Sequence, residues 1–268
     1  KCNIGCKFCY QGSAPGGRHA KYEDIEEVLV EMAKAEIFEI AIGGGEPTLH
    51  PQFFKILNKI KELGMVPNFS TKNYDFFTPQ HIERFKGVVG GIGISVSTMD
   101  DLKRYMEIMA TTQEDHKMNN DWGTTKIILH YILDQHLMSN FVELLERLSK
   151  ADNFHHHLLL LGKKDGGRST GRHKDSTGWT LFVDKFFKHD ELDGLDISVD
   201  TLIANRYGDD LRSIDKRQYY TEEGRFSVYV DAVGKKFGKA SYGVELIPYV
   251  KVKDVLKAFK KWEPIKLT

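Results

Sequence analysis

Short apolar segments alternate with amphipathic helical segments over residues 22–162, and this alternation restricts the fold more than any other feature. The segments that indicate strands are Phe38–Ile42, Val66–Ser70, Gly93–Ser97, Lys126–Leu133 and Leu158–Leu161. Helical spacing of apolar residues is found over Ile25–Ala33, Phe53–Leu63, Pro79–Phe85, Leu102–Met109 and Phe141–Leu148. Strands that alternate with helices favour βαβ units and a parallel sheet. We therefore expect an α/β fold whose sheet is covered by helices.

The size and composition are compatible with one such fold. The chain has 268 residues, of which 41% are hydrophobic and 28% are charged. This composition is typical of globular domains, and one α/β barrel can use the whole length. The apolar runs, such as Leu158–Leu161, are far shorter than the ~20 residues of a membrane-spanning helix. We expect no membrane partner.

All cysteines of the chain lie within its first nine residues, at Cys2, Cys6 and Cys9. An odd number in one cluster is no disulfide framework and suits a reducing compartment, so we expect a cytoplasmic location. A structural zinc site would need a fourth ligand, and the nearest candidate is His19, ten residues further on. Three thiolates around a [4Fe–4S] cluster would instead leave one iron open for an outside ligand.

Two motifs resemble those of a known superfamily. The segment from Cys2 to Tyr10, with Phe8 before the last cysteine, resembles the signature of radical S-adenosylmethionine (radical SAM) enzymes. The segment Gly43-Gly44-Gly45-Glu46-Pro47 follows a predicted strand and matches the superfamily's GGEP motif. Glycines at a strand end let the backbone approach a ligand closely. Both motifs and the βα alternation occur in the expected order, and the resemblance covers residues 1–162.

The resemblance implies a partial (β/α)6 TIM-like barrel in which Cys2, Cys6 and Cys9 bind one [4Fe–4S] cluster. S-adenosyl-L-methionine (SAM) would bind the open iron. One electron, from a donor such as a flavodoxin or ferredoxin, would cleave SAM to a 5′-deoxyadenosyl radical that abstracts hydrogen from the substrate. The cofactor supplies this chemistry, while the protein orients the reactants and excludes water. No side chain is identified as a catalytic acid, base or second hydrogen donor.

The residues expected near the cluster and SAM belong to the cysteine segment, the glycine motif and the strand ends. They are Phe8, Tyr10, Gly43, Gly44, Gly45, Glu46, Pro47, Ser70, Thr71, Ser95, Ser97 and His130. For each strand-end residue alone, a buried or capping polar role is an equal alternative. His130 on a strand could point outward, and Glu46 could orient the glycine turn instead of contacting a ligand.

The C-terminal part shows a different pattern, and we expect a barrel core over residues 1–189 and a small α+β extension over 190–268. Arg225–Gly234 resembles the hairpin that opens SPASM-type extensions, whose cysteines bind auxiliary clusters. No cysteine follows Cys9, and Lys239-Ala240-Ser241 stands where Pro-Cys-Ser would be expected. This sequence therefore excludes a cysteine-bound auxiliary cluster. A sixth strand would precede Cys2, so we expect further residues before Lys1.

The charge distribution bears on the substrate. Residues 235–268 contain nine lysines and three acids, a surplus of +6, although the whole chain has no net charge. The basic segment Lys163–Lys174 should lie over the site, either to bind an anionic substrate or as a solvated loop. His155, His156 and His157 cannot converge on one ion, because neighbouring strand residues face opposite sides.

Several functions are compatible with these features. A peptide is the expected substrate, because the extension resembles a SPASM hairpin. A nucleotide or nucleic-acid base is the alternative, since the basic segment and tail suit an anion. A non-catalytic iron–sulfur or SAM-binding protein and a three-cysteine zinc site are the other classes.

Overall fold

The structure is a computed structural model that describes residues 1–114, 125–133, 138–150, 156–169, 179–180, 182–183, 195–214 and 219–266. Two parts of the predicted features, His155 and residues 170–174 of the basic segment, lie outside the described residues.

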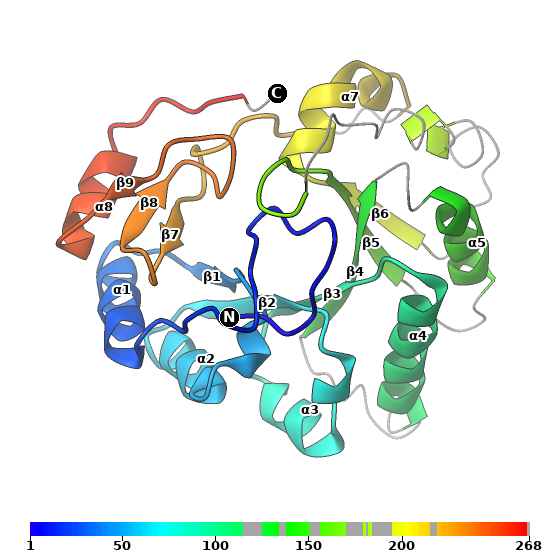
Figure 1. The fold of residues 1–268 in the computed structure, drawn as a ribbon, viewed down its shortest axis with the longest axis horizontal. Helices are drawn as coiled ribbons and strands as arrows, with labels where there is room; N and C mark the ends of the chain where they lie inside the picture. The colour runs from blue at the N-terminus through cyan, green and yellow to red at the C-terminus, as the bar shows by residue number, and fades with distance from the viewer. Residues whose placement is uncertain are drawn as a thin grey trace.

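Six parallel strands form one sheet and pair in chain order. They are β1 (Glu39–Ile42), β2 (Val66–Thr71), β3 (Gly91–Ser95), β4 (Lys126–Leu133), β5 (His156–Gly162) and β6 (Leu195–Val199). The helices beside them are α1 (Tyr22–Lys34), α2 (Phe53–Glu62), α3 (Pro79–Phe85), α4 (Met99–Glu114), α5 (Met138–Ser149) and α7 (Thr201–Ile214). Figure 1 shows the helices around the outside of a curved sheet and the N-terminal loop on its inner side. The expected α/β partial barrel is confirmed.

Side chains of the central strands alternate between two environments. On β4, Leu129, Tyr131 and Leu133 are fully buried and belong to the large core under the helices. Tyr131, for example, stacks on Phe141 of α5 at 4.8 Å between ring centroids. Residues between them, including His130, are only partly buried, because they face the inner side of the sheet. The inner side is therefore where strand side chains remain available to a ligand.

Several strand bounds differ from the sequence-based expectation. β3 begins at Gly91 and ends at Ser95, two residues before both predicted bounds, because glycines give a weak strand signal. β5 begins at His156, two residues before its predicted start. The sequence pattern also missed β6, which pairs with β5 from His156↔Leu195 to Leu160↔Val199. The main sheet thus continues past residue 190, where we expected the extension to begin, and that boundary stays a prediction.

The C-terminal segment forms a small antiparallel sheet and a helix. The sheet contains β7 (Tyr229–Asp231), β8 (Lys236–Gly238) and β9 (Ile247–Pro248), followed by α8 (Val252–Phe259). Phe237 and Val255 are buried in a second core together with Leu29 and Met32 of α1. Figure 1 shows this unit beside α1. The C-terminal unit therefore packs against the barrel through an apolar contact. Within the described ranges, no helix combines the length and hydropathy needed to cross a bilayer.

Replacing Phe237 tests whether the C-terminal unit folds together with the barrel. Phe237 is 4% exposed and stacks on Trp262 at 5.5 Å. We expect Phe237→Ala to lower the free energy of unfolding by about 3–5 kcal/mol, because a large aromatic leaves a cavity. Denaturant unfolding followed by tryptophan fluorescence should show one transition at lower denaturant. Val233→Ala, at an exposed turn, is the control, and a separate early transition in Phe237→Ala would contradict joint folding.

Candidate functional site

The three cysteines lie on an irregular segment that precedes α1, the cysteine loop (residues 1–21). Cys2 is buried, Cys6 and Cys9 are half-buried, and all three are free thiols. Gly5 has a φ angle of 72°, a left-handed conformation that glycine adopts more easily than other residues. This conformation lets the chain turn between Cys2 and Cys6. The Cys9 amide donates to the Cys6 carbonyl at 3.3 Å. The loop thus brings three thiols into one short, partly covered segment.

The thiols also influence each other electrostatically. Burial raises the pKa of the Cys6 thiol, the Lys72 ammonium opposes this effect, and Cys2 and Cys9 raise the pKa further. Negative charge on the three sulfurs together is therefore unfavourable without a nearby cation. Lys72 supplies one positive charge, and bound iron would supply more.

The donor set fits an iron–sulfur cluster better than a single zinc ion. Four ligands of one zinc ion must converge on it, at about 2.3 Å for a thiolate. Within the described part of the chain, no three side chains of His, Cys, Asp or Glu converge to hold one ion. His19, the nearest candidate for a fourth zinc ligand, packs edge-on against His50 at 5.1 Å. In a cluster each thiolate binds a different iron, so the three sulfurs need not meet.

The glycine motif after β1 contacts the cysteine loop directly. A side chain at Gly45 would place Cβ 2.1 Å from the Lys1 carbonyl oxygen and 3.3 Å from Cys2 Cβ, so only glycine allows this contact. The Glu46 amide donates to the same Lys1 carbonyl at 3.0 Å. Gly43 and Gly44, by contrast, face open space on their Cβ sides. Two adjacent glycines therefore leave their backbone accessible beside the cysteines.

The Glu46 carboxylate joins the glycine motif to the end of β2. Its Oε1 accepts bonds from the Thr48 amide at 3.2 Å, the Thr48 hydroxyl at 2.7 Å and the Thr71 hydroxyl at 2.8 Å. Its Oε2 accepts the Lys72 amide at 3.0 Å. Glu46 is 4% exposed, and Pro47 starts a 3-10 turn over Pro47–Leu49. Glu46, Pro47 and Thr71 thus support the glycine motif, and their contact with SAM stays a prediction.

Ser97 belongs to an ionic network that sequence reasoning did not detect. The Lys72 ammonium donates to the Ser97 hydroxyl and to Asp101 Oδ2, the latter at 2.6 Å. The Ser97 amide and hydroxyl also donate to Asp101, at 2.9 and 2.7 Å. Burial acts to raise the pKa of Asp101, but the bonds from Lys72 and Ser97 outweigh it and lower the pKa. The run Thr98–Asp101 is a capping box at the start of α4, a signal readable from sequence.

The aromatic residues of the cysteine loop face different partners. The Lys72 ammonium lies 5.8 Å from the Phe8 ring centroid. The Tyr10 hydroxyl hydrogen-bonds Ser241 of the C-terminal unit at 2.9 Å, and Lys164 lies 5.2 Å from the Tyr10 ring. Tyr10 thus links the loop to a segment 231 residues away. Ser241 follows the buried Ala240, and the SPASM-like character of this segment stays a prediction.

His130 lies on the inner side of the sheet, so it does not point outward. Its ring covers Gly93 of β3, where a Cβ would lie 2.1 Å from His130 Cε1. Ser95, which pairs with His130 in the β3–β4 register, ends its strand beside it, and Ser70 lies part-buried on β2. Burial lowers the pKa of His130 to about 4. The imidazole is therefore neutral at pH 7 and can donate or accept a hydrogen bond.

The two neighbouring histidines of β5 lie on opposite faces, as expected. His156 is fully buried, and its Nδ1 hydrogen-bonds the Tyr105 hydroxyl at 3.0 Å. His157 Nδ1 lies 3.4 Å from Asp196 Oδ2 of β6. They have separate partners, and no shared metal site results.

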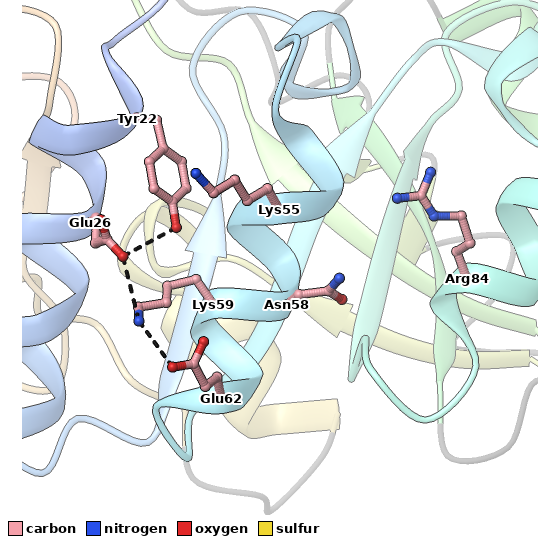
Figure 2. Close-up of a pocket in the computed structure, with 7 residues that line it drawn as sticks. All are labelled: Tyr22, Glu26, Lys55, Asn58, Lys59, Glu62 and Arg84. Carbon is pink, nitrogen blue, oxygen red and sulfur yellow. Dashed lines mark hydrogen bonds and ion pairs between the residues drawn. The ribbon is translucent and has the colours of Figure 1, made fainter.

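A pocket of about 430 Å³ lies on the outer surface, away from the strand ends. Its side chains come from α1, α2 and α3 (Figure 2). Lys59 lies between Glu26, at 3.4 Å, and Glu62, at 3.0 Å. The Lys55 ammonium lies 3.6 Å from the Tyr22 ring centroid. These charges satisfy one another, so the pocket does not indicate a catalytic site.

The cysteine loop, the glycine motif and the parallel sheet agree with one known superfamily. Residues 1–119 match the sequence model of the Radical SAM superfamily. This part of the chain resembles a radical SAM domain. The match extends past the end of α4 at Glu114, and the superfamily's use of SAM and an iron–sulfur cluster fits the three free thiols.

Proteins with sequences similar to this chain differ in the activity that their names describe. A SAM-dependent nucleotide dehydratase of Lacinutrix mariniflava is 30% identical over 107 residues, covering 37% of this chain and 22% of that protein. A probable GTP 3′,8-cyclase of Pyrococcus abyssi is 26% identical, covering 40% and 35%. Mycofactocin maturase MftC of Mycobacterium ulcerans is 29% identical, covering 26% and 19%. The chain thus aligns with about a third or less of each of these proteins.

A solved structure resembles nearly the whole chain. Streptococcus suis SuiB bound to SAM has a TM-score of 0.63 and 15% identity, and covers 97% of this chain and 61% of that chain. SuiB bound to the precursor peptide SuiA has the same TM-score and covers 89% and 57%. At this identity the likeness establishes the fold, and at 97% coverage it includes the C-terminal unit.

Glu46→Gln tests the junction under the glycine motif. The amide can accept at only one of its two terminal atoms, so its NH₂ group must face either the donors at Oε1 or the Lys72 amide at Oε2. We expect the free energy of unfolding to fall by about 1–3 kcal/mol, because a buried donor loses its acceptor. Denaturant unfolding measures this change. Glu39→Gln, at an exposed strand position, is the control, and equal stability of the two variants would contradict the assignment.

His130→Gln tests the neutral imidazole on the inner side of the sheet. The unfolded state binds a proton with a pKa of about 6.5, while the folded state binds it near 4. Between these values unfolding takes up a proton, so this contribution to stability is lost as pH falls. From pH 7 to 4.5, wild type should lose about 2–3 kcal/mol more than His130→Gln in denaturant unfolding. A parallel pH dependence of the two proteins would show that His130 titrates normally.

Proposed function

We propose that this chain binds one [4Fe–4S] cluster through Cys2, Cys6 and Cys9 and uses it to cleave SAM reductively. The observation that carries the proposal is the contact of the cysteine loop with Gly45 at the carboxyl end of β1. Barrel enzymes place their chemistry at this edge of the sheet. When bound, the cluster and SAM supply the one-electron chemistry that yields a 5′-deoxyadenosyl radical.

The backbone of Gly43 and Gly44 and the inner face of the sheet would hold SAM. The two glycines face open space and can offer amide and carbonyl groups to its polar end. Ser70, Ser95 and His130 would contribute uncharged polar groups from β2, β3 and β4. A neutral His130 can bond the ligand without placing a positive charge beside the sulfonium of SAM. Phe8 and Tyr10 would lie along the cysteine loop beside the cluster.

A peptide is the substrate that we favour. SuiB, which has been captured with a precursor peptide, resembles this chain over 89–97% of its length, including the C-terminal unit. The nucleotide enzymes align with 37–40% of it. The likeness to the peptide-bound structure thus extends over more of the chain, including residues that could contact a substrate beyond SAM. A nucleotide remains the second candidate, because relatives named as nucleotide enzymes are 26–30% identical to this chain over 107 residues.

An external protein would deliver the electron. Residues 10–268 contain no cysteine, so this stretch offers no thiolate for a second cluster that would relay electrons. A flavodoxin or ferredoxin is the donor class that we propose.

Anaerobic reconstitution with iron and sulfide tests the activity. Wild type with SAM and dithionite should release 5′-deoxyadenosine, detected by liquid chromatography and mass spectrometry. Cys6→Ala should reduce the rate at least about a hundredfold, because a cluster that lacks one of its three thiolate ligands is not assembled or is lost. Lys7→Ala, an exposed neighbour in the same loop, should retain the rate. Equal rates in wild type and Cys6→Ala would contradict the proposal.

The same reaction distinguishes the candidate functions. Deuterium should pass into 5′-deoxyadenosine from a labelled peptide but not from labelled nucleotides. Transfer from a nucleotide alone would replace the peptide by the second candidate. A cluster whose electron paramagnetic resonance spectrum responds to SAM without any cleavage would indicate a non-catalytic SAM-binding protein.

A further inference from the structure

The cysteine loop is held by a segment that lies more than 150 residues away in sequence. Arg168, in the loop after β5, contacts three of its carbonyl groups. The Arg168 amide donates to the Cys9 carbonyl at 2.9 Å. Its guanidinium donates from Nε to the Cys6 carbonyl at 3.0 Å and from Nη1 to the Ser13 carbonyl at 2.8 Å. One residue thus bonds the backbone of two of the three cysteines.

The turn that carries Arg168 is shaped for close contact with the cysteine loop. Gly166 and Ser169 exchange two backbone bonds, at 2.9 and 2.8 Å, which close the turn. Gly167 has φ of 51°, and a Cβ there would lie 2.4 Å from the Gly12 nitrogen and 2.7 Å from the Cys9 carbonyl oxygen. Glycine is therefore required for the two backbones to approach. In Figure 1 the green loop after β5 lies against the blue N-terminal loop.

The Arg168 contacts stabilise a loop that has no secondary structure of its own. The loop has no helix or strand, so its conformation depends on bonds to other parts of the chain. A guanidinium presents several donors in a fixed planar geometry, and it can bond two carbonyl groups at once. A lysine ammonium has the same charge but lacks this planar fork. The arrangement also places a permanent positive charge at the Cys6 and Ser13 carbonyl groups.

We propose that Arg168 is a positioning residue that holds the cysteine loop in its cluster-binding conformation and provides a fixed positive charge next to the cluster. The basic segment after β5 therefore acts, through this residue, on the protein's own loop. The conformational part of this inference concerns the apoprotein, while the effect on the cluster rests on the proposed function. The two parts are tested separately.

The first experiment uses the apoprotein and limited trypsin digestion, with cleavage after the exposed Lys7 followed by mass spectrometry. Arg168→Gln should be cleaved there about fivefold faster than wild type, because lost hydrogen bonds favour local opening. Arg168→Lys should be cleaved at an intermediate rate. Arg147→Gln, which removes an exposed guanidinium paired with Glu143 on α5, is the matched control and should match wild type. Equal cleavage of Arg168→Gln and wild type overturns the conformational role.

The second experiment uses protein reconstituted with iron and sulfide. A ferrous chelator should remove iron from Arg168→Gln about fivefold faster than from wild type or Arg147→Gln, because the loop opens more often. The midpoint potential of the cluster should become more negative in Arg168→Gln and stay near wild type in Arg168→Lys, because lysine keeps the charge. Unchanged iron release and an unchanged potential would overturn the effect on the cluster.

Folding and cofactor controls keep the outcomes distinct. Circular dichroism and thermal unfolding establish that each variant is folded, and Arg168→Lys serves as the milder variant if Arg168→Gln is not. If no protein, wild type included, assembles a cluster, the proposed function fails, as does the effect of Arg168 on it. The trypsin result still decides whether Arg168 holds the loop.

Discussion

The close backbone contact between Gly45 and the Lys1–Cys2 segment is the constraint on which the site depends. Any side chain at position 45 would overlap the Lys1 carbonyl, so the cysteine loop can reach the carboxyl edge of the sheet only over a glycine. Glu46 then holds the glycine motif in place, because its carboxylate accepts hydrogen bonds from Thr48 and from the end of β2. One buried carboxylate thus joins the glycine motif to a strand that lies about 25 residues further along the chain. The glycine motif is in this sense a structural support for the cysteine loop.

The sequence predicted the parts of this structure that depend on local pattern. Helical spacing and short apolar runs located β1 to β5, because each of these elements is determined by neighbouring residues. The cysteine spacing and the GGEP motif are likewise local patterns, and the structure brings these two segments into contact. The sixth strand was missed because it follows a long interval without a regular pattern and depends on its pairing with β5.

The residues that support the site were harder to predict. Arg168 occurs in a segment of several basic residues, and nothing in its local sequence distinguishes it from a solvated side chain. Its role follows from contact with Cys6 and Ser13, at separations of 162 and 155 residues. Lys72 likewise meets Asp101 and the cysteine loop only in the folded chain. The Thr98–Asp101 capping box is the one supporting feature that sequence alone could have revealed.

The long separations in the cysteine loop set an order of events during synthesis. The cysteines emerge before their partners, because the Arg168 contacts require residue 168 and the Tyr10–Ser241 bond requires residue 241. At about 5–20 residues per second, roughly 10–50 s pass between the appearance of Tyr10 and that of Ser241. Throughout that interval the thiols are present on an incompletely held loop. Oxidation of the thiols and binding of other metal ions to them therefore compete with folding during synthesis, before the site is complete.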